Sequence, residues 1–332
     1  MKAVRIVRPG SVDGVELADV AEPGCGPDEL LVQVQATALN RADLLQVLGR
    51  YPPPPGVPQD IPGLEYAGTV LRAGERVQRF RSGERVMGLV GGGAFAERLV
   101  THEREAMPVP EGLELAPAAA VPEAFLTAFD ALVLQGEMRP HARVLVHAAA
   151  SGVGTAALQL VQLFGAEAIG TARTEEKLER CRAVAPFHPL LVPPGAPRFA
   201  PRVLELTGGA GVDIVLDLVG GRYLAESLNC LASRGRMLMV GTLDGPRADL
   251  DLSRLLHRRA RIIGTVLRTR PLEEKAALAR SFEEQVLPAF AGGRIRAVVD
   301  AVLPLASAPV ALARMAANAS VGKLVLSVGE AR

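Results

Sequence analysis

The chain has 332 residues, a length that predicts two domains, each able to bury a core of its own. Its composition, with 49% hydrophobic and 22% charged residues and a formal net charge of +1, is typical of a soluble globular protein and argues against a broad nucleic-acid-binding surface. We interpret the densest positive cluster, formed by Arg254, His257, Arg258, Arg259 and Arg261, as a solvated helix end.

Neither export nor a membrane span is predicted. The first seven residues alternate charged and apolar side chains as a strand does, where a signal peptide would have a continuous apolar stretch. The apolar region of residues 118–134 is interrupted by a proline and two acidic residues. Cys25, Cys181 and Cys230 are widely spaced, which favours a reducing compartment over a disulfide framework or a thiolate zinc site. We therefore expect a cytoplasmic protein.

Residues 1 to about 120 predict a small, irregular β domain. Short runs of alternating polarity at residues 30–34, 68–71 and 85–89 are typical of strands, and glycine, proline and charged turns separate them. The proline run at residues 52–55 and the three glycines at residues 91–93 predict loops.

From about residue 123 apolar strands alternate with amphipathic helical stretches. Strands are predicted at residues 143–148, 166–171, 212–218, 235–240 and 261–266. Repeated strand-helix-strand units predict an α/β, Rossmann-type, doubly wound parallel sheet. We assign a last strand, residues 323–328, to the first domain. The expected domains are therefore residues 1–122 with 266–332, and residues 123–265.

The first predicted strand of the parallel sheet ends in a turn suited to a dinucleotide. Small residues lead into Ser151, Gly152, Val153 and Gly154, and a helical pattern follows. Such a turn lets the backbone approach a pyrophosphate, and the helix behind it offers free N–H groups and a positive dipole. A tight turn without a ligand is the alternative interpretation.

The end of the next strand favours NADPH over NADH. NAD sites usually carry a carboxylate there, whereas this strand ends with Arg173 and Thr174, followed by Lys177. Two cations and a hydroxyl suit the 2′-phosphate of NADPH. Glu175 and Glu176 fit the first turn of a helix that Thr174 caps. The alternative is that both cations are solvated surface residues.

Several spaced motifs resemble one family. They are Asn40-Arg41-Ala42-Asp43, Tyr51-Pro52-Pro53-Pro54, Gly63-Leu64-Glu65-Tyr66-Ala67-Gly68, Glu123-Ala124-Phe125-Leu126-Thr127-Ala128, Ser151-Gly152-Val153-Gly154, Asp217-Leu218-Val219-Gly220-Gly221 and Gly322-Lys323-Leu324-Val325-Leu326. Together they resemble the zeta-crystallin type of quinone oxidoreductase in the medium-chain dehydrogenase/reductase superfamily. The resemblance runs almost end to end and implies a GroES-like, β-rich catalytic domain beside the Rossmann domain.

The resemblance also implies that no metal is bound. Zinc-dependent members place a cysteine where this chain has Asn40 and a Gly-His-Glu where it has Gly63-Leu64-Glu65. Leucine cannot bind a metal, asparagine is a poor zinc ligand, and the lobe with four cysteines is missing. We expect Glu65 to serve as a local hydrogen-bond acceptor.

The resemblance implies roles for further residues. Asn40, Asp43 and Tyr51 would line the substrate side of the nicotinamide, with Tyr51 orienting a carbonyl or helping to protonate the product; alternatively Asn40 and Asp43 only cap a helix. The resemblance also implies further cofactor-binding residues besides the turn at residues 151–154 and the two cations. They are Thr127, Val219, Gly241, Leu243, Leu267, Arg268 and Lys323. Arg268 and Lys323 have the alternative of being surface residues.

One position departs from the family. Its members commonly carry a tyrosine after the third strand of the Rossmann domain, beside the 2′-phosphate, and residues 186–194 contain none. His188 is the candidate that would replace it.

These observations predict an NADPH:quinone oxidoreductase that transfers hydride without a metal, in a cleft between the two domains, to a quinone or related electron-poor carbonyl. The alternatives are an NADPH-dependent enoyl reductase acting on a carbon–carbon double bond, and a crystallin-like protein that binds NADPH without turnover. The family is commonly dimeric, and an open parallel sheet leaves an edge strand that two subunits can pair, so we expect a homodimer.

Overall fold

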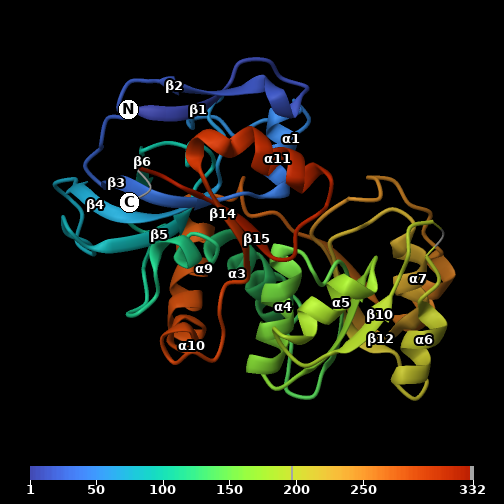
Figure 1. The fold of residues 1–332 in the computed structure, drawn as a ribbon. Coiled ribbons are helices and arrows are strands. Elements are labelled where there is room, and N and C mark those ends of the chain that lie inside the picture. Colours follow the sequence, from blue (N-terminus) through green and yellow to red (C-terminus); the bar gives the residue numbers. More distant parts are fainter. Residues whose placement is uncertain (196, 330–332) are drawn as a thin grey trace. The chain divides into compact units, whose positions relative to one another are not determined.

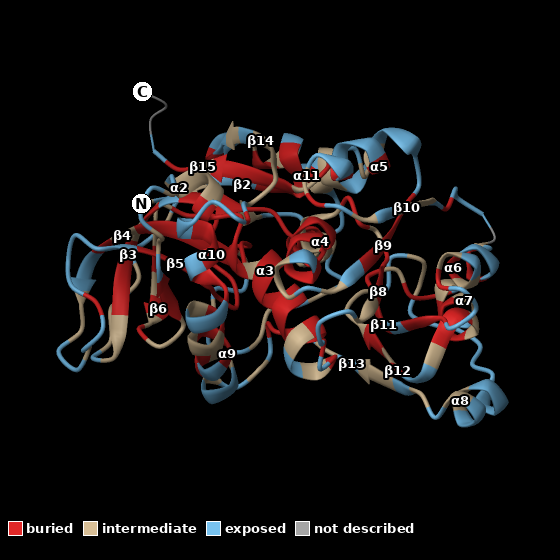
Figure 2. Ribbon diagram, turned by 90° about the horizontal axis from the view of Figure 1, so that it is seen from below, coloured by how far each residue is buried: buried red, intermediate tan, exposed pale blue. Residues whose placement is uncertain are grey.

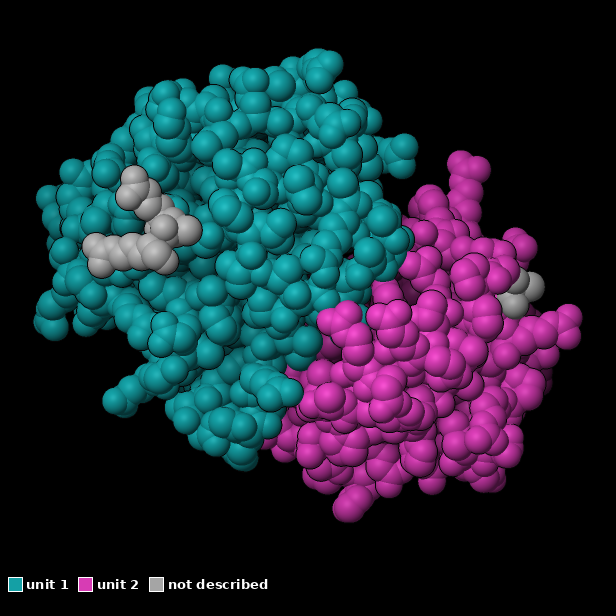
Figure 3. All heavy atoms as spheres, in the orientation of Figure 1, with its two compact units in different colours: residues 1–126, 267–332 teal, residues 127–266 magenta. Residues whose placement is uncertain are grey.

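The computed structural model describes residues 1–195 and 197–329. The chain divides into two compact units, Met1–Leu126 with Leu267–Arg332 (unit 1) and Thr127–Val266 (unit 2), drawn in teal and magenta in Figure 3. The chain passes from unit 1 to unit 2 four residues later than expected, and it returns to unit 1 one residue later than expected. The later first crossing has a packing reason: the start of helix α3 (Pro122–Phe129) belongs to unit 1, where the Phe125 ring packs edge-on against Phe290.

Unit 2 contains a six-stranded sheet in the order β10-β9-β8-β11-β12-β13, with every pairing parallel. The strands are β8 (Arg143–Val146), β9 (Glu167–Ala172), β10 (His188–Leu191), β11 (Val212–Asp217), β12 (Leu231–Met239) and β13 (Arg261–Gly264). Five of them were predicted. The sixth, β10, was missed because it is a four-residue edge strand that contains a proline, and its pattern is too short to show a period.

Helices cover both faces of this sheet, as the doubly wound arrangement requires (Figure 1). They are α4 (Gly152–Leu163), α5 (Glu175–Arg182), α6 (Ala200–Leu206), α7 (Tyr223–Cys230) and α8 (Leu252–Arg258). Helix α4 packs on β8 and β9, whereas α7 and α8 pack on β12. A π-helical segment (Asp130–Gln135) extends α3. Figure 2 colours the central strands as buried and α8 as exposed, so the basic cluster at the end of α8 is solvated, as predicted.

The strand order reverses beside β8, because β9 pairs one of its edges and β11 pairs the other. Parallel strands end at the same side of a sheet, and the crevice beyond those ends at such a reversal is the usual ligand site of doubly wound folds. The fold of unit 2 therefore brings the loops that follow β8, β9 and β11 to one edge.

Unit 1 is built on a seven-stranded sheet in which β14-β15-β3-β4-β5-β7 are neighbours in that order and β6 also pairs with β3. The strands are β3 (Glu29–Ala38), β4 (Glu65–Ala73), β5 (Arg85–Leu89), β6 (Arg98–His102), β7 (Ala106–Pro108), β14 (Val299–Pro304) and β15 (Lys323–Ser327). Strand β15 runs antiparallel to β3, which confirms that the end of the chain returns to the first domain. A separate antiparallel pair is formed by β1 (Lys2–Ile6) and β2 (Val15–Asp19).

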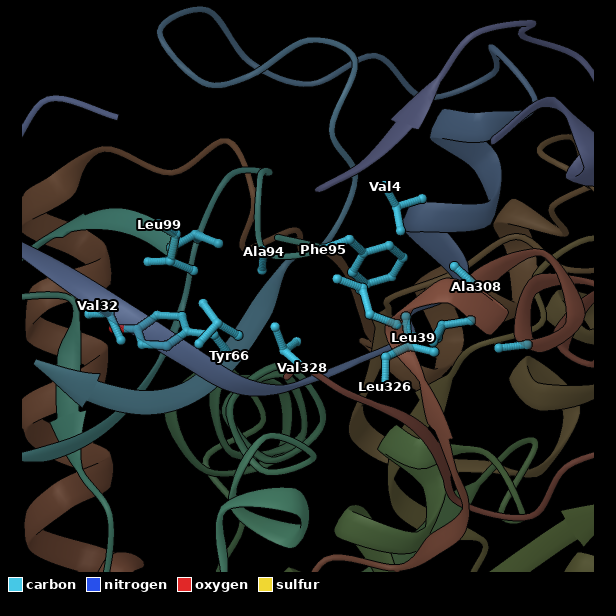
Figure 4. Packing of buried hydrophobic residues seen from close by; sticks show 14 of the residues in the cluster. Val4, Val32, Leu39, Tyr66, Ala94, Phe95, Leu99, Ala308, Leu326 and Val328 are labelled. Atoms are coloured by element: carbon cyan, nitrogen blue, oxygen red, sulfur yellow. The ribbon is translucent and has the colours of Figure 1, made fainter. Parts of the chain in front are cut away.

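The core of unit 1 gathers side chains from both ends of the chain. Tyr66 and Phe95 pack among aliphatic side chains, with Val4 from β1 and Leu326 from β15 in the same cluster (Figure 4). The helices of unit 1 are α1 (Arg41–Val47), α2 (Leu115–Ala118), α9 (Leu272–Gln285), α10 (Leu287–Ala291) and α11 (Ala308–Ala316), with 3-10 turns at Val12–Gly14 and Leu305–Ser307. Within the described part of the chain, every helix is too short or too polar to cross a bilayer.

Candidate active site

The turn after β8 has the geometry expected of a dinucleotide-binding turn. Ser151 caps α4, and its Oγ accepts a hydrogen bond of 3.0 Å from the Gly154 amide. A Cβ atom at position 154 would lie 2.3 Å from the Ala148 carbonyl oxygen, so only glycine allows the helix to start this close to the strand. The start of a twelve-residue helix, with its positive dipole end, thus faces the edge where the strands finish. These residues fit a pyrophosphate group.

The loops after β11 and β12 reach the same edge of the sheet. Asp217, the last residue of β11, accepts hydrogen bonds from the amides of Val219 (2.8 Å) and Gly220 (2.9 Å), which shapes the loop. Gly241 follows β12, and a Cβ atom there would lie 2.7 Å from the Leu218 carbonyl oxygen. Leu243 is half exposed. The predicted cofactor contacts of Val219, Gly241 and Leu243 are therefore grouped in space, although their binding role stays a prediction.

The two cations assigned to the 2′-phosphate follow β9, the neighbour of β8. Arg173 is exposed directly after the last strand residue, Ala172. Thr174 caps α5 by accepting a hydrogen bond from the Lys177 amide, and Glu175 and Glu176 occupy the first turn, as expected. The cap holds Lys177 one turn beyond Arg173.

The suggestion that His188 replaces the missing tyrosine is wrong. His188 is the first residue of β10 and pairs with Ile169, whereas the end of β10, Leu191, pairs with Ala172. At about 3.3 Å per strand residue, His188 lies roughly 10 Å toward the opposite edge from the residues that follow β9.

Beneath the turn lies a buried histidine that the sequence reasoning did not identify. The ring nitrogens of His147 lie 3.1 Å from Thr171 Oγ1 and 2.8 Å from Ser227 Oγ, and the ring packs against Phe199 and Tyr223. Burial lowers the pKa of His147 to about 4, so the ring is neutral at pH 7. It ties β8 to β9 and α7 just before the turn. A histidine at the end of an apolar strand was the only sign of it.

Two of the residues predicted for the substrate side, Asn40 and Asp43, belong to a polar cluster in unit 1, defined here as Asn40, Asp43, Glu65, Glu123 and Lys323. All but Glu123, which is partly exposed, are buried. Asp43 is fully buried: its Oδ2 accepts from the Asn40 amide (2.7 Å) and its Oδ1 from the Gly63 amide (2.9 Å). Asp43 therefore caps the start of α1, as the alternative interpretation of this residue expected. Burial raises its pKa to about 6, against the opposing effect of these two hydrogen bonds.

Lys323 is the centre of this polar cluster and is not a surface residue, since only 4% of it is exposed. Its Nζ donates hydrogen bonds to the Leu39 carbonyl (2.7 Å) and to Asn40 Oδ1 (2.5 Å), and it forms an ion pair with Glu65 Oε1 at 2.6 Å. These three contacts engage the ammonium group on the side of Asn40 and Glu65. The predicted contact of Lys323 with the cofactor remains a prediction, and its charge is held by Glu65.

Glu65 is a hydrogen-bond acceptor, as expected. Besides Lys323, its Oε1 accepts from Asn40 Nδ2 (2.9 Å), and its Oε2 accepts from the Glu123 amide at the start of α3 (2.8 Å). Zinc-dependent members carry a cysteine at the position of Asn40 and a Gly-His-Glu motif at residues 63–65. In this chain Asn40 and Glu65 instead contact Lys323. Within the described residues no group of three or more histidine, cysteine or acidic side chains is arranged to hold a metal ion.

Arg268 positions Tyr51. The guanidinium carbon lies 5.1 Å from the centre of the Tyr51 ring, and Nη1 donates to the Tyr51 carbonyl at 3.4 Å. The other bonds of Arg268 go to the Gly91 carbonyl (2.7 Å) and to Gln46 Oε1 (2.5 Å), residues that the sequence reasoning missed. Arg268 is 4% exposed, which rules out the surface alternative. Burial raises the pKa of Tyr51, and the nearby Arg268 charge opposes that rise.

Leu267 and Thr127 are the remaining predicted residues. Leu267 is buried beside Arg268 in unit 1, while Thr127 is buried on α3, at the start of unit 2. Neither position tests the predicted cofactor contact.

Two family profiles match the chain, one for each kind of domain. The alcohol dehydrogenase GroES-like domain matches residues 26–111, and the zinc-binding dehydrogenase profile matches residues 152–302.

Curated relatives fall into two groups. The quinone oxidoreductase of Pseudomonas aeruginosa is 31% identical over 330 residues, covering 98% of this chain and 99% of the relative. Erythronolide synthase EryA2 of Saccharopolyspora erythraea is 35% identical over 328 residues, which are 96% of this chain but 8% of the synthase. The chain therefore spans a small part of the polyketide synthases that it matches.

Solved structures agree over the whole chain. A quinone oxidoreductase of Pseudomonas syringae pv. tomato superimposes with a TM-score of 0.87 at 27% identity, covering 98% of this chain and 99% of that one. A mycobacterial protein solved in complex with NADPH gives 0.86 at 30% identity (98% and 99%), and the CurK enoyl reductase gives 0.84 at 26% (99% and 99%).

Both domain profiles, a full-length relative and the fold agree with the resemblance of the motifs. The chain has a Rossmann-like nucleotide-binding domain and belongs to the medium-chain dehydrogenase/reductase superfamily, where it fits the zeta-crystallin type of quinone oxidoreductase.

Proposed function

We propose that this chain transfers hydride from NADPH to a quinone or a related electron-poor carbonyl, an NADPH:quinone oxidoreductase activity. The observation that carries the choice of cofactor is the end of β9, where Arg173 and the helix-held Lys177 stand beside the dinucleotide turn. Cations there favour a 2′-phosphate, which a carboxylate would repel. The NADPH complex of the mycobacterial neighbour supports the same choice.

In this proposal the chain holds NADPH through three groups of residues. Ser151, Gly152, Val153 and Gly154 bind the pyrophosphate, and Arg173 with Lys177 binds the 2′-phosphate. The residues proposed to flank the nicotinamide and its ribose are Thr127, Val219, Gly241, Leu243, Leu267 and Arg268. When bound, NADPH supplies the hydride. Lys323 acts on the site indirectly, because its donors hold Asn40 and Glu65.

The substrate side of the proposal rests on Tyr51. Arg268 holds its ring from one side, so the phenol is available to orient a carbonyl oxygen. Asn40 and Asp43 support this region through the start of α1. Because Asn40 and Glu65 already bind Lys323, we propose catalysis without a metal, which suits an acceptor that is electron-poor enough to take hydride unaided.

A second candidate is the reduction of an activated carbon–carbon double bond. The match to part of polyketide synthases and the likeness to the CurK enoyl reductase favour it. A third is NADPH binding without turnover. We would follow NADPH oxidation by the purified chain with an ortho-quinone, with an enoyl thioester and with no acceptor. Faster turnover of the quinone supports the proposal, faster turnover of the thioester selects the enoyl reductase, and tight NADPH binding without either turnover selects the third.

We also propose a cytoplasmic homodimer formed through the free edge of β13. This strand ends the six-stranded sheet, and the neighbouring α8 exposes two leucines one turn apart, Leu252 (63%) and Leu256 (74%). The free cysteines favour the cytoplasm. Sedimentation should give a dimer that Leu256→Glu weakens, whereas Val310→Glu, at a residue that is similarly exposed on α11 (62%), should not. A monomeric wild type would exclude the dimer.

A further inference from the structure

Three carboxylates, those of Asp43, Glu65 and Glu123, belong to the polar cluster of unit 1, and they differ in the donors that they receive. Both oxygens of Asp43 accept backbone amides, from Asn40 and Gly63. Both oxygens of Glu65 are engaged as well, one by Lys323 and Asn40 and the other by the amide of Glu123. Buried Oε2 of Glu123, in contrast, has no hydrogen-bond partner among the residues that the structure describes.

The cations that face Glu123 are committed elsewhere. Lys323, on β15, donates hydrogen bonds to Leu39 and Asn40 and forms an ion pair with Glu65. Arg268 donates to Gly91, Gln46 and Tyr51. Glu123 is only partly exposed, and an ionised carboxylate with one buried oxygen that lacks a donor, next to a second carboxylate, is costly, whereas a protonated one is not. The arrangement of donors therefore assigns a proton to Glu123.

The electrostatics of the cluster agree with this assignment. Burial is the main effect that raises the pKa of Glu123 to about 8, and the charges of Glu65 and Asp43 add to it, while Lys323 and Arg268 oppose it. A helix N-terminus would normally favour the ionised form. Here the amide of Glu123 itself is already taken by Glu65 Oε2.

We propose that Glu123 carries a proton at neutral pH and serves as the proton store that resupplies Tyr51 during reduction. This inference rests on the proposed reductase function. Glu123 lies on α3 one turn before Thr127, a residue proposed to contact the nicotinamide. Its charge contributes to the raised pKa of Tyr51, so the two groups interact electrostatically.

The proton balance is simple. A nicotinamide dinucleotide is the hydride source, and an acceptor that has taken hydride is an anion that needs one proton. The Tyr51 O–H bond breaks to supply it, the Glu123 O–H bond breaks to restore the phenol, and water returns a proton to the Glu123 carboxylate. Because burial raises the pKa of Tyr51, its phenol loses a proton readily only when another is delivered, so a store behind it has a function.

Infrared spectroscopy tests the store without turnover. The carbonyl stretch of protonated carboxyl groups should be present at about pH 7 in the wild type and should contain a component that disappears with a midpoint near pH 8, and this component should be missing from Glu123→Gln. Glu283 is the matched control: its pKa is also raised, to about 7, but it lies on α9 and pairs with Arg79 and Arg280. Glu283→Gln should remove only its own contribution. A wild type without a band titrating near pH 8 overturns the inference.

The pH dependence of turnover supplies the second test. With an ortho-quinone, kcat of the wild type should fall above about pH 8, and Glu123→Gln should lower kcat about tenfold at neutral pH and abolish this alkaline decrease. Glu123→Asp should recover part of the rate, and Glu283→Gln should keep the wild-type profile. An alkaline decrease that persists in Glu123→Gln refutes the role. If no acceptor is reduced at all, the proposed function fails, while the infrared result still decides whether Glu123 holds a proton.

Discussion

The buried His147 makes unit 2 sensitive to acid, and the size of the effect follows from its surroundings. Burial lowers the pKa of its ring from 6.5 to about 4. In the unfolded chain the ring takes up a proton below about pH 6.5, but in the folded chain it does so only near pH 4. Stability is therefore complete above pH 6.5 and is lost as the pH falls toward 4. Since one pKa unit corresponds to about 1.4 kcal/mol, the loss is about 3 kcal/mol.

Urea unfolding measured by circular dichroism at about pH 7.5 and about pH 4 would test this value. Carboxylates add a pH dependence of their own, so the comparison is between variants. His147→Gln cannot titrate and should lose about 3 kcal/mol less between the two pH values than the wild type. His188→Gln, at an exposed histidine on β10, should behave as the wild type. Equal losses for the wild type and His147→Gln would refute the reasoning.

Three further predictions concern binding, stability and metal. Replacing Arg173 and Lys177 by alanine should weaken NADPH binding far more than NADH binding in calorimetric titrations; equal losses would contradict the phosphate assignment. Lys323→Met should lower the free energy of unfolding by about 3–5 kcal/mol, because it leaves the Glu65 carboxylate buried without its cation, and adding Glu65→Gln should recover part of the loss. If the losses of Lys323→Met and Glu65→Gln in urea unfolding simply add in the double variant, the ion pair of Lys323 with Glu65 does not stabilise the fold. Exhaustive chelation should leave NADPH oxidation unchanged, and a rate that falls and returns with added zinc would overturn catalysis without a metal.

Local patterns in the chain were enough to predict the nucleotide-binding half. The strand, the tight turn ending at Gly154 and the helix behind it are consecutive, so their periodicity and spacing carry the information. Arg173 was found the same way, as the residue after the next apolar strand. Among the six strands of unit 2, β10 was not predicted, because four residues at a sheet edge show no period.

The contacts of the substrate side join residues that are far apart in the chain. Lys323 bonds Asn40 across 283 residues, and Arg268 bonds Gln46 across 222. In the nucleotide-binding half, the contact of His147 with Ser227 likewise spans 80 residues. From the sequence alone, Arg268 and Lys323 could be either surface residues or cofactor-binding residues. Burial and the identity of a hydrogen-bond partner are properties of packed strands and helices that no stretch of neighbouring residues contains, so only the tertiary structure decided which carboxylates are satisfied and which one keeps a proton.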